Sequence, residues 1–250
     1  MFTDADLSRD AFLGGRILLW QPLIGYRAAT DPVLLAAACP AAPGQSVLDL
    51  GCGAGTAALC LAARIPGLTL TGLELQPAYA ALARRNATEN AIQLHVIEGD
   101  FATTPLSTAF DQIIANPPYY PRAGSPSPTP SRDTANRAET PITEWIAFAA
   151  RRLTPGGWLT MICGTDSLPE ILSALPPKLG SAVVLPLAAR ADRPALRIIL
   201  RARKGGRAAF RLLAPLILHQ GAAHDSDRNS YTPKANAILR DAADLSAMFG

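Results

Sequence analysis

The sequence predicts an α/β fold, with helices on both faces of a seven-stranded, mostly parallel sheet that has an antiparallel edge. Three observations support this prediction. Before Ser181, short apolar runs alternate with longer segments of helical composition. A glycine-rich turn, DLGCGAG (49–55), overlaps the end of the first of these runs. Beyond Ser181 the apolar runs lie closer together. Strands that alternate with helices form parallel sheets buried on both faces, and closely spaced strands pair antiparallel.

The expected elements follow one another in a regular order. The predicted parallel strands are SVLDL (46–50), LTLTGLEL (68–75), LHVIEGD (94–100), FDQIIAN (110–116) and WLTMICG (158–164). The predicted helices between them are AALCLAARI (57–65), QPAYAALARRNATEN (76–90) and residues 142–153. The antiparallel edge is expected at 182–188, 196–202 and about 208–213, with KGGR (204–207) as a hairpin turn.

Two segments fall outside this repeating pattern. Residues 1–45 hold the apolar run RILLWQPLIG and the helix candidate DPVLLAAA, and we expect them to form a cover packed on the site. Residues 46–250 then form the main domain. Within it, residues 121–140 are rich in Pro, Ser and Thr, which predicts a mobile loop, either a flap beside the site or a surface linker.

Composition restricts the class of protein. Apolar residues make up 49% of the chain and charged residues 17%, which allows a sizeable core and excludes global disorder. The N-terminus lacks the pattern of a secretory signal, and no apolar run approaches the roughly 18 residues of a membrane span. The four cysteines form no CxxC pair and the histidines have no metal-ligand spacing. We therefore expect a cytoplasmic protein with reduced, buried thiols and no metal.

Positive charge is concentrated near the C-terminal third. Residues 186–211 hold eight basic side chains against one acid, Asp192. The basic residues are Arg190, Arg193, Arg197, Arg201, Arg203, Lys204, Arg207 and Arg211. Such an excess indicates either a phosphate-binding face or a solvated hairpin whose arginines keep a sheet edge soluble.

Polar residues follow the predicted strands where each strand ends. The glycine turn after the first strand brings the backbone close to a ligand at a helix N-terminus. Glu74 ends the second strand, where a carboxylate can bind both hydroxyls of a ribose. Asp100, followed by Phe101, can bind an adenine amine and ring, and Asn116 ends the fourth strand. Ligands of open α/β sheets bind at this edge, so these residues predict one crevice, although each acid alone is commonly a surface residue or helix cap.

The motifs DLGCGAG, GLE, EGDF and NPPYY, in this order, resemble class I S-adenosylmethionine-dependent methyltransferases that act on amino groups. The resemblance covers about residues 45–200 and implies a Rossmann-like fold and S-adenosyl-L-methionine as cofactor. It implies that Glu74 and Leu75 bind the ribose side of the cofactor, and that Asp100 and Phe101 bind the adenine. The residues implied at the methionine and ribose part are Asp49, Gly51, Gly53 and Gly55.

The resemblance also assigns a role to the rigid turn Asn116-Pro117-Pro118-Tyr119. An amine conjugated to an aromatic ring is a poor nucleophile because its lone pair is delocalised. If the Asn116 oxygen and the Pro117 carbonyl accept its hydrogens, they favour a pyramidal nitrogen whose lone pair faces the methyl group. The prolines hold this geometry with little reorganisation. Tyr119 would stack on a base swung out of its own stack. The alternative interpretation of an Asn-Pro-Pro segment is a turn with a purely structural role.

Asn-Pro-Pro-Tyr is shared by enzymes that methylate adenine N6, guanine N2 or glutamine N5, so the motif leaves the substrate open. YRAATDPVLLAAA (26–38) is similar to an element of the bacterial valine-tRNA adenine-N6 methyltransferase family, as are the doubled tyrosine and Tyr231-Thr232-Pro233. That resemblance places Thr30 and Asp31 near the methionine end of the cofactor. It implies a monomer that methylates an adenine of tRNA next to the anticodon. A glutamine-N5 methyltransferase of release factors, another RNA amino-methyltransferase such as one of ribosomal RNA, and a non-catalytic RNA-binding module remain the alternatives.

Overall fold

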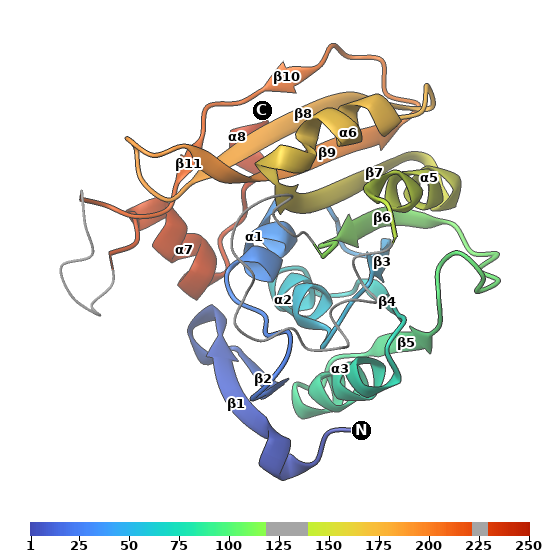
Figure 1. Cartoon of the computed structure of the whole chain (residues 1–250), viewed down its shortest axis with the longest axis vertical. Helices are drawn as coiled ribbons and strands as arrows, with labels where there is room; N and C mark the ends of the chain where they lie inside the picture. The colour runs from blue at the N-terminus through green and yellow to red at the C-terminus, as the bar shows by residue number, and fades with distance from the viewer. Residues whose placement is uncertain (119–139, 222–229) are drawn as a thin grey trace.

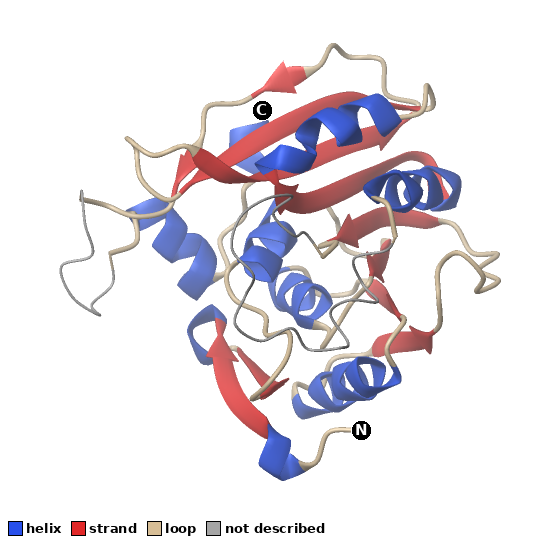
Figure 2. Cartoon of the chain, in the orientation of Figure 1, coloured by secondary structure: helices blue, strands red, loops and turns tan. Residues whose placement is uncertain are grey.

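The computed structural model describes residues 1–118, 140–221 and 230–250. A single mixed sheet dominates this part of the chain, in the order β10-β8-β9-β7-β6-β3-β4-β5, with β11 also paired to β8 (Figures 1 and 2). The parallel strands are β3 (Ser46–Leu50), β4 (Thr69–Glu74), β5 (Leu94–Glu98), β6 (Phe110–Ala115) and β7 (Leu153–Gly164). The predicted mostly parallel sheet with an antiparallel edge is confirmed, although in the described part of the chain it has nine strands and not seven, because β10 and β11 add to β8.

Helices cover both faces of the sheet because successive strand residues point in opposite directions. Ile114 packs with α1 (Asp31–Ala38), α2 (Thr56–Arg64), α7 (Pro233–Asp241) and α8 (Ser246–Phe249). Its neighbour Ile113 packs on the other face, with α5 (Ile142–Arg152) and α6 (Leu168–Ala174). Helix α3 (Pro77–Glu89) packs beside β4 and β5 at the end of the sheet (Figure 1). Two short 3₁₀ turns, Asp4–Asp6 and Thr165–Ser167, precede β1 and α6, and a third, Leu13–Gly15, joins β1 to β2.

The C-terminal edge of the sheet differs from the prediction. Strands β8 (Leu179–Ala188) and β9 (Ala195–Lys204) form the expected antiparallel pair. The turn KGGR does not form a hairpin, however, because the chain passes from β9 to the far side of β8. There β10 (Arg211–Leu212) and β11 (Leu216–Ile217) pair parallel to β8. The alternation of apolar residues predicts strands but carries no information about which edge the next strand joins.

The first 22 residues form a hairpin of β1 (Leu7–Phe12) and β2 (Ile17–Pro22), which docks on α3. Asn86 of α3 and Asn90, which directly follows α3, replace a neighbouring strand for β2. The Asn86 amide accepts from Trp20 N at 2.7 Å and donates to Trp20 O at 3.1 Å. Asn90 makes the equivalent pair of bonds with Leu18, at 2.8 and 2.7 Å. These bonds satisfy main-chain groups of β2, and residues 23–30 then lead towards α1.

The remaining expectations concern single residues. All four cysteines, Cys39, Cys52, Cys60 and Cys163, are buried free thiols, and burial raises the pKa of Cys39, Cys60 and Cys163 to about 12. Among the described residues, no helix is long and apolar enough to cross a bilayer, and no group of three or more acidic, cysteine and histidine side chains could hold a metal ion.

A carboxyl group lies inside the core at Asp49, which is 2% exposed in the middle of the sheet. Its Oδ2 accepts a hydrogen bond from Ala58 N at 3.1 Å, in the first turn of α2. This bond satisfies an N–H that the helix itself leaves unpaired. Burial raises the pKa of Asp49 to about 7, against the opposing effect of the Ala58 bond and with a smaller contribution from the charge of Glu74.

This pKa predicts a pH-dependent stability. From the ordinary carboxyl pKa of 3.8 up to about 7, the folded protein retains a proton on Asp49 that the unfolded chain has released. The free energy of unfolding therefore falls as pH rises through this window, by at most about 1.4 kcal/mol per pH unit from this group, and levels off above it. Asp49→Asn keeps an oxygen for Ala58 N but cannot titrate.

Urea unfolding of both proteins from about pH 5 to pH 8 checks this prediction. The unfolding free energy of the wild type minus that of Asp49→Asn should decrease with pH and then flatten. A difference that stays constant across the range would contradict the elevated pKa.

Candidate functional site

The predicted site residues lie at the carboxyl edge, which we define as the edge where the parallel strands β3, β4, β5, β6 and β7 end. The strand register brings these ends level: Leu50 of β3 pairs with Leu73 of β4 and with Ala115 of β6. Glu74 and Asn116 each directly follow these paired residues. The structure therefore brings the ends of the predicted strands together, as parallel pairing requires.

Glu74 links the glycine turn to β4. Its side chain is only 3% exposed, and its Oε2 accepts from Gly53 N at 2.8 Å while Oε1 accepts from Gln76 N at 2.9 Å. These two main-chain bonds, one to each oxygen, fix the orientation of the carboxylate. The next residue, Leu75, is 48% exposed and presents an apolar side chain beside this carboxylate at the edge.

The glycine turn adopts a conformation that only glycines allow easily. Gly51, Gly53 and Gly55 all have positive φ, of 69°, 56° and 83°. A Cβ at Gly51 would also lie 2.6 Å from the ring of Trp145, so this position accepts no side chain. The carboxyl of Asp49, at the start of the motif, faces the first turn of α2. The turn thus offers bare main chain between a buried aromatic ring and a buried carboxylate.

Asp100 and Phe101 follow β5 in a compact turn. Asp100 Oδ1 accepts from Ala102 N at 2.8 Å, and its main-chain oxygen accepts from Thr104 N at 2.7 Å. The Phe101 ring packs edge-on against Trp145, with ring centroids 5.0 Å apart, and lies 5.3 Å from the Phe148 ring. Phe101 is thereby fixed by α5 on one face of the sheet.

Thr30 and Asp31 begin α1, whose N-terminus also lies at the carboxyl edge. The Asp31 carboxylate pairs with Arg197 Nε at 3.1 Å. Arg197 lies opposite Gly164, the last residue of β7. Thr30 is the residue before the helix and its side chain makes no capping hydrogen bond. The ion pair therefore ties α1 to the strand next to β7, at the same edge as Asn116.

Asn116 has an unusual hydrogen-bond environment. Its Nδ2 donates to the hydroxyl of Tyr26 at 3.2 Å. Its Oδ1 is buried, and no hydrogen-bond partner for it is found in the described part of the protein. Pro117 is buried and Pro118 is partly buried, whereas Tyr119 and residues 121–139 of the predicted loop lie outside the described residues. A buried acceptor without a donor costs about 1–3 kcal/mol, so such groups indicate a position that another molecule completes.

The basic segment 186–211 does not form one face, which corrects the expectation of a single basic hairpin. β9 runs antiparallel to β7, so its end lies at the opposite, amino edge: Arg203 pairs with Trp158, far from the last residue of β7. Several of its cations bind main-chain oxygens: Arg201 Nε donates to Ala38 O at 2.5 Å and Lys204 Nζ to Leu153 O at 2.6 Å. Arg201 is also 6% exposed and lies 3.6 Å from the centroid of the Phe249 ring.

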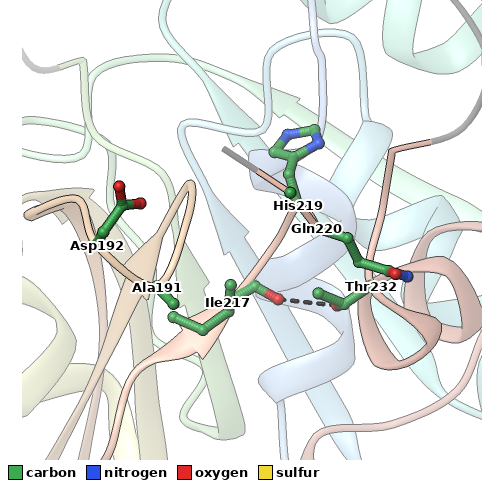
Figure 3. A pocket seen from close by; sticks show the side chains of 7 residues that line it. Ala191, Asp192, Ile217, His219, Gln220 and Thr232 are labelled. Atoms are coloured by element: carbon green, nitrogen blue, oxygen red, sulfur yellow. Dashed lines mark hydrogen bonds between the residues drawn. The ribbon is translucent and has the colours of Figure 1, made fainter. Parts of the chain in front are cut away.

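Only the beginning of this segment lies near the carboxyl edge. Arg190, 8% exposed, donates to Gly221 O at 2.6 Å, and Arg197 pairs with Asp31, whereas Arg193 is exposed in the turn between β8 and β9. Beside this turn lies a hollow of about 410 Å³ (Figure 3). It is lined by Ala191, Asp192, Ile217, His219, Gln220, Gly221 and Thr232. None of the residues predicted to bind the cofactor lines it.

Sequence analysis missed Tyr26, Tyr79 and Trp145 as parts of the site. Tyr26 reaches Asn116, Tyr79 OH donates to Tyr26 O at 3.1 Å, and Trp145 covers Gly51. Tyr26 is the first residue of the segment YRAATDPVLLAAA, and its place in that segment was the one signal that could have suggested a role. Trp145 belongs to the apolar face of an amphipathic helix, which in sequence is indistinguishable from an ordinary core residue.

Comparisons with known proteins agree with this geometry. Residues 29–174 match the model of the methyltransferase small domain family. A tRNA1(Val) (adenine(37)-N6)-methyltransferase of Porphyromonas gingivalis is 32% identical over 174 residues, 65% of this chain and 68% of that protein. A release factor glutamine methyltransferase of Geobacter sulfurreducens is 29% identical over 175 residues, 66% of this chain and 62% of that protein.

Solved structures share the fold. A crystal structure from Agrobacterium tumefaciens, described as a predicted O-methyltransferase, has a TM-score of 0.71 and 26% identity and covers 86% of this chain and 98% of its own. The 16S rRNA N2 G1207 methyltransferase of Thermus thermophilus, in complex with AdoMet and guanosine, has a TM-score of 0.56 and 22% identity, covering 79% of this chain and half of its own. Family and fold support S-adenosyl-L-methionine as the cofactor.

The family match covers more than half of the chain, and the parallel strands end at a glycine turn, a buried carboxylate and an Asn-Pro-Pro segment. The chain therefore belongs to the methyltransferase small domain family and has the Rossmann-like class I methyltransferase fold.

Proposed function

We propose that this protein transfers the methyl group of S-adenosyl-L-methionine to the exocyclic N6 amine of an adenine in tRNA, beside the anticodon, in the cytoplasm. The observation that carries the proposal is the buried Oδ1 of Asn116, an acceptor at the end of β6 for which the described residues supply no donor. An amine with two hydrogens would supply that donor.

The residues around the glycine turn fit the cofactor. The space beside Gly51 is filled by Trp145, but a Cβ at Gly53 would have its nearest neighbour, the Tyr26 ring, 3.8 Å away, so a ligand can approach the backbone closely there. We assign the ribose hydroxyls to the Glu74 carboxylate, which Gly53 N and Gln76 N orient, with the exposed Leu75 beside it, and the adenine to Asp100 and Phe101. Thr30 and Asp31 lie at the methionine end in this proposal. When bound, S-adenosyl-L-methionine supplies an electrophilic methyl group on a positively charged sulfur.

The Asn-Pro-Pro segment favours an amine over a hydroxyl as the methyl acceptor. A hydroxyl has to lose its proton to become a good nucleophile, which requires a base. The amide of Asn116 and the carbonyl of Pro117 accept hydrogen bonds but do not take up protons at neutral pH. They can orient an amine and localise its lone pair. The nitrogen–carbon bond then forms as the sulfur–carbon bond breaks, and the acidic alkylated nitrogen releases its proton to water.

The substrate class is proposed from the relatives and from the surface around Asn116. Several relatives that are 30–34% identical to this chain are named tRNA1(Val) (adenine(37)-N6)-methyltransferases. Apolar side chains are exposed beside Tyr26 at Leu23 and Ile24, which are 55% and 83% exposed, and across the edge at Leu196, which is 66% exposed. Exposed apolar side chains near Tyr26 in sequence, and an exposed basic residue, Arg193, in the turn between β8 and β9, suit a flipped base held within a nucleic acid.

The direct test is methyl transfer from labelled S-adenosyl-L-methionine to tRNA isolated from cells that lack this protein. Nucleoside analysis should detect new N6-methyladenosine. Release factors and ribosomal RNA are assayed in parallel. Incorporation into a glutamine of a release factor, and none into tRNA, would replace the proposed substrate with that protein. Methylation of a hydroxyl would overturn the amine chemistry itself.

Substitution of the proposed catalytic amide gives a sharper prediction. Asn116→Ala removes the acceptor for the target amine but leaves the glycine turn and Glu74 in place. We expect the turnover number to fall by about 10²–10³-fold, the usual cost of removing one positioned hydrogen-bonding group. The dissociation constant for S-adenosylhomocysteine, measured by calorimetry, should change by less than about threefold. Wild-type turnover in this variant would contradict the proposed role.

A further prediction compares two exposed arginines at opposite edges of the sheet. Arg193 lies in the turn between β8 and β9 at the carboxyl edge, whereas Arg207 follows β9 at the amino edge. Arg193→Ala should weaken tRNA binding and reduce the slope of log affinity against log salt by about one unit. Arg207→Ala, with the same loss of charge, serves as the matched control and should leave both unchanged.

Filter binding or fluorescence anisotropy at several salt concentrations measures these slopes. Equal effects of the two substitutions would mean that tRNA binding depends on the net charge of the protein and not on a local contact of Arg193, which would contradict the proposed binding face. A larger effect at Arg207 would place the RNA on the opposite edge and contradict the proposed binding face.

A further inference from the structure

Tyr26 contacts the proposed catalytic amide from a distant part of the sequence. It lies in the segment between β2 and α1, 90 residues before Asn116, and its hydroxyl accepts a hydrogen bond from Asn116 Nδ2 at 3.2 Å. Because the amide nitrogen faces Tyr26, the amide oxygen faces the other way. That oxygen is the buried Oδ1 that lacks a donor among the described residues.

The position of Tyr26 is itself determined by several contacts. Its main-chain oxygen accepts from Tyr79 OH at 3.1 Å, and the two rings lie 6.5 Å apart at 57°. A Cβ at Gly53 would lie 3.8 Å from the Tyr26 ring, so the ring stands beside the glycine turn. The two residues after Tyr26 bond back to β2: Arg27 donates to Pro22 O and Ala28 N donates to Gln21 Oε1, both at 2.7 Å.

An asparagine amide has one accepting end and one donating end, and the two have nearly the same shape. Only the accepting end can receive a hydrogen of the target amine. If the amide turned over, its NH₂ group would face the amine, and two donors would oppose each other. The amide orientation is therefore a requirement of the chemistry. A tyrosine hydroxyl can donate or accept, and here the Tyr26 hydroxyl accepts from Nδ2, the arrangement that leaves Oδ1 for the amine.

We propose that Tyr26 is a positioning residue, whose hydroxyl holds the amide of Asn116 with its oxygen towards the target amine. The proposal rests on the amine methylation put forward above. Tyr26 also stands between the glycine turn and Asn116, so it links the cofactor side of the site to the amine side. Its action is on Asn116 and not on the transferred methyl group.

The test is a double-mutant cycle between Tyr26→Phe and Asn116→Asp, measured as the single-turnover rate of methyl transfer with saturating tRNA and cofactor. Tyr26→Phe keeps the ring but lacks the hydroxyl, and should reduce the rate about 10- to 100-fold. Binding of S-adenosylhomocysteine and KM for tRNA should stay within about threefold of wild type.

Asn116→Asp supplies the matched background. A carboxylate has an oxygen at both ends, so there is no orientation to select. In that background Tyr26→Phe should change the rate by less than about threefold. The same loss in both backgrounds would mean that Tyr26 acts only through general structure and would overturn the proposal. So would a wild-type rate in Tyr26→Phe.

A second measurement does not require activity. In protein labelled with ¹⁵N at asparagine side chains, the Asn116 NH₂ signals are identified by their loss in Asn116→Asp. Their hydrogen exchange with solvent should be faster in Tyr26→Phe than in the wild type, because the acceptor has been removed. Equal exchange would overturn the positioning role. A wild-type enzyme that is inactive on tRNA would instead refute the proposed substrate. The double-mutant cycle would then use whichever substrate, release factor or ribosomal RNA, accepts the methyl group.

Discussion

The hydrogen bond between Gly53 N and the buried carboxylate of Glu74 is the contact on which the rest of the site depends. It joins the turn after β3 to the end of β4 at 2.8 Å. The turn is thereby held with its glycines at positive φ, α2 starts from its last glycine, and Trp145 covers its first. A negative charge with so little exposure is tolerated because main-chain N–H groups satisfy both of its oxygens.

Two separate sets of contacts meet at Asn116. On one side the register of β3, β4 and β6 brings the strand ends level. On the other, Asn86 of α3 and Asn90 just after it hold the N-terminal hairpin, and the segment that leaves this hairpin carries Tyr26 to the amide. The family match supplies the chemistry expected at such an edge, and the donor-free oxygen of Asn116 supplies the specific atom. The proposed function follows from their combination.

Much of the sheet could be predicted because parallel strands buried on both faces are continuous apolar runs, and β3, β4, β5 and β6 lie where these runs do. Beyond β7 the antiparallel pair of β8 and β9 was predicted, but not that β10 and β11 join the outer side of β8, parallel to it, nor at which edge of the sheet each arginine lies. Because β9 returns antiparallel, Arg203 and Arg207 lie at the amino edge although they neighbour Arg197 in sequence. Arg201 proved to be a structural residue: it is buried against Phe249, and this burial lowers its pKa to about 10. The contact of Tyr26 with Asn116 spans 90 residues and leaves no periodic signal.

The central claim is that Asn116 Oδ1 receives the target amine. A crystal structure of the protein with S-adenosylhomocysteine and adenosine, or with a short RNA that contains the target adenine, tests it directly. The account predicts adenine N6 within about 3.2 Å of Asn116 Oδ1, with Nδ2 still on the Tyr26 hydroxyl. An adenine bound elsewhere, or an amide turned so that Nδ2 faces the base, would contradict it.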